Sequence, residues 1–283
     1  MGVVVRVFLC FGGDRLKIAD CFEEAPMNAM PVPTIAPEPA PTPLSQGSRI
    51  VNTFIAPSRT FSDLRRSASW WAPWLLMAML SVLFSFSMDR NVGFDQISKN
   101  EIAKSSRAEQ FDKLPAGQQA QQLQISTLIT RCIAYGYPAL MLVGFVIVAA
   151  VLMGTFNLGA GASVPFKVAL AIVIYGNLPG ILHGLLGTIA LFVGTMAGSL
   201  DKEAFNITNP VATNLASFMD PAGNKFAYSM ATAVDVFAIW TIVLLGIGFA
   251  CNSTVKRGTA IAIVAGWFLF VKLVGASVAA FFG

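Results

Sequence analysis

Long apolar segments, separated by polar or turn-forming residues, dominate the chain from residue 70 onward. A helix rises about 1.5 Å per residue, so about twenty apolar residues match the hydrocarbon thickness of a bilayer. The pattern predicts an all-α integral membrane protein with about five transmembrane helices in a membrane domain of residues 69–283. The predicted spans are residues 70–88, 133–156, 168–197, 227–250 and 259–281.

The sequence Gly176-Asn177-Leu178-Pro179-Gly180 interrupts the third predicted span. Proline lacks an amide hydrogen and clashes with the preceding helical turn, and glycine is a poor helix former. This span is therefore expected to be kinked or locally unwound, and a re-entrant path stays open. Residues 89–125, between the first two spans, mix charges with glutamines and are predicted to form a solvated, partly helical loop.

Residues 48–68 alternate apolar positions near helical spacing with arginines. A basic amphipathic stretch directly before a span usually lies among lipid headgroups, so an interfacial amphipathic helix is predicted here. Ser58, after Pro57, is the expected N-cap of a second short helix. The apolar positions are Ile50, Val51, Phe54, Ile55, Phe61 and Leu64, and the bases are Arg49, Arg59, Arg65 and Arg66.

Residues 1–47 are predicted to be a disordered, proline-rich arm. Six prolines fall within residues 31–47, where fixed φ angles and missing amide donors prevent regular helix or sheet. A tether and a docking site for a protein partner are the two interpretations of this arm. Residues 1–26 fit either a secretory signal or an over-extended start ahead of Met27 or Met30.

Composition supports the membrane assignment. Apolar residues make up 55% of the chain and charged residues 12%, about half the usual charged share. Only six bases and four acids follow Arg131. So few charges cannot cover a water-facing surface, and lipid is the solvent that suits residues 132–283.

The charges that flank the spans predict the orientation of the chain. On one side they comprise seven bases in short stretches whose chief acid is Asp63, whereas the two opposite loops hold seven bases and eight acids. The positive-inside rule therefore predicts a cytoplasmic N-terminus and an outside C-terminus. The net charge of +4 is small and the bases flank apolar runs, so nucleic-acid binding is not expected.

Nothing in the sequence indicates an enzyme, a metal site or a cofactor. His183 is the single histidine, and the four cysteines show no CxxC spacing. A His-paired nucleophile, a zinc site and a disulfide framework therefore lack the residues that they need.

Two charges fall well inside predicted spans. Asp235 and Lys272 lie at depths of about 12 and 15 Å, counted from the outer ends of the fourth and fifth spans. An isolated charge there costs at least about 2.5–3.5 kcal/mol, so we expect the two to lie close together across a helix–helix contact. Arg131 is the second candidate partner. The alternative is that Lys272 snorkels and Asp235 lies in the outer headgroup layer.

Polar residues also flank the break in the third span. Asn177 and His183 lie on either side of Pro179. They could line a polar path beside the backbone carbonyls that proline leaves without a donor. The alternative is that they only hydrogen-bond that backbone.

Short motifs follow one another in order over about residues 50–283. They are FIAPSRTF (54–61), WWAPW (70–74), YGNLPG (175–180), NPVATN (209–214), DVFAIW (235–240), GIGFA (246–250) and VKRGTAIAIVAGW (255–267). In order and span count the chain resembles the Yip domain family (Ypt/Rab-interacting proteins), most of all its bacterial branch. The motif positions are Pro57, Phe61, Pro73, Asn209, Pro210, Asn214 and Trp240.

The resemblance implies a five-span fold with a cytoplasmic N-terminus, in the inner membrane of a bacterium. Eukaryotic relatives act in vesicle trafficking and engage prenylated Rab-type GTPases, but the short arm here has no acidic recognition segment. We expect a non-enzymatic membrane-organising or adaptor protein whose partners are the bilayer and a protein bound by the arm; an oligomer stays open. The alternative is a small transporter or channel subunit with a polar path near Asn177, His183, Asp235 and Lys272.

Overall fold

The computed structural model describes residues 42–105, 108–207, 210–220 and 223–282, which form helices and no strand. Residues from Pro43 onward make one compact unit. The helices are α1 (Gln46–Ile55), α2 (Pro57–Asp63), α3 (Trp71–Asn91), α4 (Phe94–Lys104), α5 (Ala108–Asp112), α6 (Ala116–Gly154), α7 (Phe166–Gly176), α8 (Pro179–Met196), α9 (Lys225–Ala231), α10 (Val236–Cys251) and α11 (Arg257–Phe282), with a π-helical turn η1 (Thr155–Gly159) and a 3₁₀ turn η2 (Leu215–Phe218).

The proline-rich arm lies, up to residue 41, outside the described residues. Its predicted boundary at residue 47 is too late, because α1 already begins at Gln46. Ser45 caps this helix by accepting a hydrogen bond from the Ser48 amide at 3.1 Å. A serine directly before an apolar periodic stretch is the usual N-cap signal.

Four helical segments are long and apolar enough to cross a membrane: α3, α6 with η1, α7 with α8, and α11. This confirms the all-α, membrane-spanning class. The predicted span 227–250 is not one helix, since α9 ends at Ala231 and α10 begins at Val236. The sixteen residues of α10 reach about 24 Å, less than the roughly 30 Å of a hydrocarbon core. Four long segments and one shorter apolar helix thus stand where five spans were predicted.

The second span is much longer than predicted. Helix α6 has 39 residues, about 58 Å, and it continues past Pro138 to the π-helical turn η1. Its first turns are rich in glutamine, alanine and leucine, which are good helix formers in water as well as in lipid. With α4 and α5 also present, the segment 89–125 is more helical than a partly helical loop.

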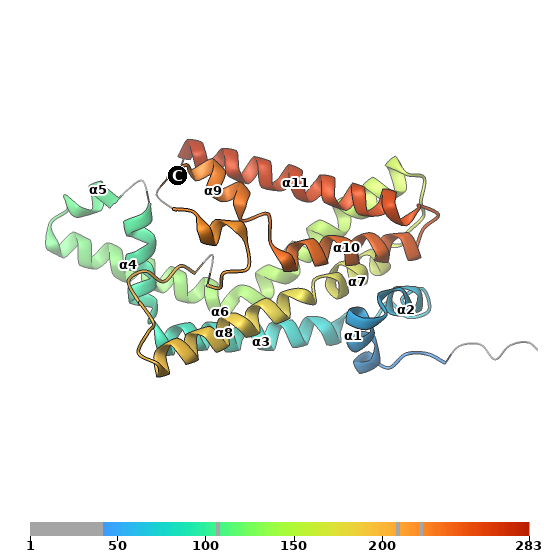
Figure 1. The fold of residues 1–283 in the computed structure, drawn as a ribbon, viewed down its shortest axis with the longest axis horizontal. Coiled ribbons are helices and arrows are strands. Elements are labelled where there is room, and N and C mark those ends of the chain that lie inside the picture. The colour runs from blue at the N-terminus through green and yellow to red at the C-terminus, as the bar shows by residue number, and fades with distance from the viewer. Residues whose placement is uncertain (1–41, 106–107, 208–209, 221–222, 283) are drawn as a thin grey trace, which may run out of the picture. The chain divides into compact units, whose positions relative to one another are not determined.

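The long helices pack in a connected set of pairs. Helix α3 contacts α6 and α8, and α10 contacts α7, α8 and α11, as can be followed in Figure 1. Helix α6 contacts α7 and α3. The α7–α8 segment is therefore the central element, with a neighbour from each half of the chain.

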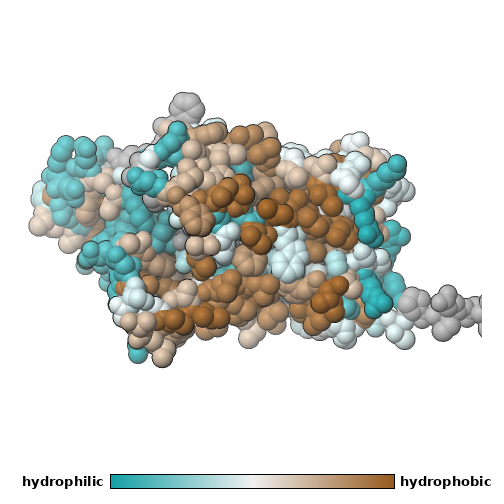
Figure 2. All heavy atoms as spheres, viewed as in Figure 1, coloured by the Kyte–Doolittle hydropathy of each residue, from teal (hydrophilic) through white to brown (hydrophobic). Residues whose placement is uncertain are grey.

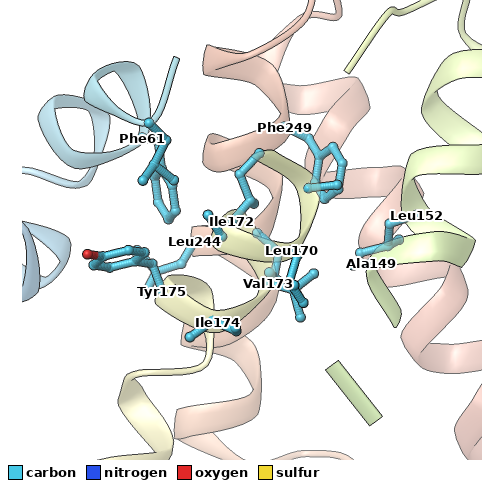
Figure 3. Close-up of a cluster of buried hydrophobic side chains, with 14 of the residues drawn as sticks. Phe61, Ala149, Leu152, Leu170, Ile172, Val173, Ile174, Tyr175, Leu244 and Phe249 are labelled. Carbon is cyan, nitrogen blue, oxygen red and sulfur yellow. The ribbon is translucent and has the colours of Figure 1, made fainter. Parts of the chain in front are cut away.

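Figure 3 shows part of the main cluster of buried hydrophobic side chains in this unit. Ile172 of α7 lies between Phe61 of α2 and Phe249 of α10, Tyr175 lies near Phe61, and all four side chains are fully buried. Gly248 permits this packing, because a Cβ there would lie 2.4 Å from Ile172 Cγ2. Small residues allow helices to approach closely where lipid supplies no hydrophobic drive.

Helices α1 and α2 form a hairpin packed against the bundle, which changes the picture of a helix lying freely in the headgroup layer. Phe61 and Leu64 are fully buried in the main core. Asn252, just after α10, donates to the Phe61 carbonyl at 2.9 Å. Arg257, at the start of α11, donates to the Ser58 hydroxyl at 3.2 Å. The hairpin is thus part of the folded unit.

The cap of α2 also differs from the prediction. The N-cap is Ala56, and Pro57 occupies the first helical position. Proline suits that position because its missing amide would have no partner there. Ser58 is instead inside the helix and binds Arg257 through its hydroxyl.

The surface has the polarity of a membrane protein. On the face in Figure 2, hydrophobic residues gather over the middle of the long helices, and hydrophilic residues lie towards α4–α5 and towards the α1–α2 hairpin. Large apolar side chains such as Leu83, Val143 and Phe192 are more than a third exposed. Exposed apolar surface of this extent marks an interaction site, and on four helices long enough to span a bilayer it fits contact with lipid.

Candidate functional site

The break between α7 and α8 is the centre of the candidate site. Helix α7 ends at Gly176 and α8 begins at Pro179. The Asn177 side chain donates to the Val173 carbonyl at 2.8 Å, and the Gly180 amide donates to the Asn177 carbonyl at 3.0 Å. Asn177 therefore binds backbone, as its simpler interpretation predicted, while it also faces two cavities.

The larger cavity, of about 620 Å³, lies between α3, α6 and α8, with α4 and the loop after α8 at one end. Its wall is mostly apolar and includes Met77, Met141 and Phe145. Glu101 of α4 is the one charged residue among its described lining. A cavity of this size and polarity suits a mainly hydrocarbon ligand.

The smaller cavity, of about 400 Å³, lies on the α10–α11 side of the break. Its wall contains all four residues of the predicted polar path: Asn177, His183, Asp235 and Lys272. Asn177, Gly180 and His183 line both cavities. The break thus brings together polar residues that lie almost a hundred positions apart in the sequence.

Asp235 does not form the predicted ion pair with Lys272. Its carboxylate caps α10, accepting from the amides of Phe237 and Ala238 at 2.9 Å each, and it accepts from the Thr213 hydroxyl at 2.5 Å. A carboxylate at a helix N-terminus is stabilised by the free amides and by the helix dipole. These three donors satisfy the charge without a lysine, which is why the helix begins here and the predicted span is interrupted.

Lys272 and Arg131 have other neighbours. The Lys272 ammonium lies 5.7 Å from the centre of the Phe268 ring, and no carboxylate among the described residues lies within ion-pair distance of it. Arg131 pairs with Asp89 at 3.7 Å and lies over the Phe94 ring, so it is not the partner of Asp235. Lys272 is left as a half-buried cation in the cavity wall.

His183 lies on the wall that the cavities share. Its ring centre is 5.6 Å from that of Phe237, and its Nε2 atom is buried without a hydrogen-bond partner among the described residues. A buried unsatisfied nitrogen is costly. The backbone-binding interpretation therefore fits Asn177 but leaves this histidine atom unexplained.

A buried ion pair in the hairpin was missed from the sequence. Arg49 Nε donates to an Asp63 carboxylate oxygen at 2.7 Å, and the two side chains are 3% and 8% exposed. Arg49 also donates to the Ser67 carbonyl at 2.9 Å, while Thr53 and Thr60 both donate to the Arg49 carbonyl. The available signal was Asp63 itself, the single acid among the arginines of residues 48–68.

The motif positions divide between the hairpin contact and the cavities. Phe61 is buried in the core, Pro57 begins α2 and Pro73 is buried in α3. Trp240 of α10 packs edge-on against Phe54 of α1, with ring centres 5.6 Å apart. Pro210 lines the larger cavity and Asn214 the smaller. Asn209 lies outside the described residues.

A family model, the Yip1 domain, matches residues 51–279. The match covers most of the chain, from the second turn of α1 into the last turns of α11. The chain belongs to the Yip1 domain family. No curated protein and no solved structure shows significant similarity to it. The α7–α8 break, both cavities and the hairpin from residue 51 onward lie inside the matched Yip1 domain, whereas the first turn of α1 and the proline-rich arm precede it.

Proposed function

We propose that this Yip1-domain membrane protein is a non-enzymatic adaptor that organises membrane or recruits a partner through its N-terminal arm. The α1–α2 hairpin supports the proposal best. It joins the arm to the bundle through a buried ion pair and two buried apolar side chains, Phe61 and Leu64. A recruiting arm needs a firm attachment of this kind to the membrane-spanning part.

The proposal places the hairpin on the cytoplasmic side of a bacterial inner membrane. Its exposed bases include Arg59, Arg65 and Arg66, and further exposed bases are Lys167 in the first turn of α7, Lys256, and Arg257 at the start of α11. Asp63, the one acid in these stretches, is bound to Arg49. A strong surplus of bases in short flanking stretches favours the cytoplasmic side.

The structure determines where the testing truncation should end. Removal of residues 1–66 would also remove Arg49, Phe61 and Leu64 and so would damage the core. Removal of residues 1–42 leaves the compact unit that begins at Pro43. The truncation after residue 42 therefore separates recruitment from folding.

The experiment is in-membrane cross-linking, followed by purification of the full chain and of the chain lacking residues 1–42. The adaptor role predicts specific partners that are lost with the arm, while thermal unfolding of the two proteins stays the same. Identical partner sets for both proteins would contradict recruitment by the arm.

A second candidate, a small transporter or channel subunit, is favoured by one observation. The smaller cavity contains Asn177, His183, Asp235 and Lys272 beside a broken helix. Broken helices often carry the binding sites of transporters. This role predicts substrate-dependent flux in proteoliposomes that is reduced by Lys272→Met, whereas a pure adaptor gives no flux with either protein.

A further inference from the structure

Two nitrogen groups in the wall of the smaller cavity, one of them shared with the larger cavity, have no ion-pair or hydrogen-bond partner among the described residues. His183 Nε2 is buried and unpaired, and the Lys272 ammonium has only the Phe268 ring beside it within the described part of the chain. Asp235, the acid of the smaller cavity, already has three donors. Among the described residues, the smaller cavity therefore offers Lys272 no free carboxylate, and an anionic oxygen would supply that charge partner.

The depth of Lys272 strengthens this requirement. It lies ten residues before the last residue of α11, about 15 Å along an apolar helix. An ammonium group at such a depth is costly unless it is paired or reaches water. Within the described part of the chain no carboxylate pairs with Lys272, and a ligand with a negative head would supply that partner.

The larger cavity suits the apolar part of such a ligand. Met77, Met141, Phe145 and Ile181 give it an apolar wall, and methionine adapts well to flexible chains. Glu101 is the one charge among its described lining residues, and no cation in that wall offsets its repulsion of an anionic head. The smaller cavity has Lys272 as well as Asp235. The smaller cavity thus suits a charged head, and the larger cavity suits a hydrocarbon tail.

We propose that the two cavities together bind an amphiphile with an anionic head. The head lies at Lys272 and His183 in the smaller cavity, and the hydrocarbon tail lies in the larger one. A carboxylate of a fatty acid and a phosphate of a membrane lipid share this chemistry. The proposal is independent of recruitment by the arm, because it rests on the bundle alone.

Glycines in the cavity wall allow the tail site to be blocked selectively. A Cβ added at Gly184, which lines only the larger cavity, meets no atom within 4 Å. Gly184→Phe should therefore fill the cavity without displacing the helices. Gly136→Phe is the matched control, because Gly136 of α6 has the same open surroundings, lies on the exposed surface and lines neither cavity.

The test measures binding to the full-length protein in phosphatidylcholine nanodiscs. The probes share one oleoyl tail and carry a carboxylate (oleate), a phosphate (oleoyl lysophosphatidate) or an uncharged glycerol (mono-oleoylglycerol). We expect at least one anionic probe to bind about tenfold or more tightly than the neutral one, as a charge-assisted contact would give. The better of the two anions identifies the source of the head.

Four variants test the proposal. Gly184→Phe and Lys272→Met should each weaken anion binding about tenfold or more, whereas Gly136→Phe and Lys272→Arg should bind nearly as the parent does. Thermal unfolding shows whether each variant is folded. If Lys272→Met does not fold, Lys272→Arg still tests whether a cation at this position supports anion binding. Equal binding of neutral and anionic probes, absence of saturable binding, or retention of anion binding by either disruptive variant would overturn the proposal.

Discussion

Several charged residues have partners within the protein, whereas Lys272 has no carboxylate partner among the described residues. Arg49 and Asp63 pair inside the hairpin, Asp235 caps α10, and Arg131 pairs with Asp89. We expected Asp235 to pair with a cation, but its carboxylate accepts hydrogen bonds from two backbone amides and a hydroxyl instead. Backbone amides at a helix start can replace a cation, and no spacing in the sequence distinguishes the two solutions.

Arg49→Met should destabilise the protein by about 3–5 kcal/mol, because it leaves the Asp63 carboxylate buried without its partner. Arg59→Met on the exposed side of the same hairpin should change stability by no more than about 0.5 kcal/mol. Unfolding in detergent monitors both. Equal effects of the two substitutions would show that the buried pair is not important.

Asp235→Asn should have little effect on stability, because asparagine also accepts hydrogen bonds from the first free amides of a helix. Asp235→Ala should cost about 0.5–2 kcal/mol through loss of the cap of α10. Thermal unfolding of the two variants distinguishes capping from ion pairing. If Asn were as damaging as Ala, the negative charge and not the cap would be required.

At the scale of elements, the sequence predicts where helices occur better than where each helix begins, ends or is interrupted. The apolar segments gave α3, α11 and the break before Pro179 near their predicted places. The extension of α6 and the split between α9 and α10 were missed. Hydropathy does not reveal that polar residues outside the lipid continue a helix, and it does not reveal a helix cap within an apolar segment. The docked hairpin was also missed, since its amphipathic pattern fits a protein surface as well as a lipid surface.

The contact of α10 with α11 depends on Gly246. A Cβ at this position would lie 2.7 Å from Ile261 Cα and 2.9 Å from Ile261 N. Backbone atoms cannot yield as a flexible side chain can, so Gly246→Ala should separate the helices and cost about 1–3 kcal/mol.

Gly136→Ala is the matched control, because a Cβ there meets nothing within 4 Å. It should leave stability unchanged or raise it slightly through better helix propensity. Thermal unfolding in one detergent compares the two variants. A neutral Gly246→Ala would contradict the close packing of α10 on α11.

At the scale of the whole molecule, the described part of the chain combines a docked N-terminal hairpin with a helix bundle that holds two cavities. The membrane class and the family were accessible from the sequence, because both depend on the order of long segments. The larger cavity was not, since its wall comes from helices α3, α4, α6 and α8, and only tertiary packing brings these together. The smaller one was anticipated in part, because polar residues inside apolar spans are rare.

The central claim is that lipid surrounds the middle of these helices. Spin labels on single cysteines, introduced after replacement of the native ones, test it in reconstituted protein. Labels at Val143, Phe192 and Leu269, on exposed apolar positions of three helices, are compared with a label at Gln121 in the polar extension of α6. We predict high access to oxygen and low access to a water-soluble nickel chelate at the first three, with the reverse at Gln121. Nickel access at Val143, Phe192 and Leu269 equal to that at Gln121 would contradict the account.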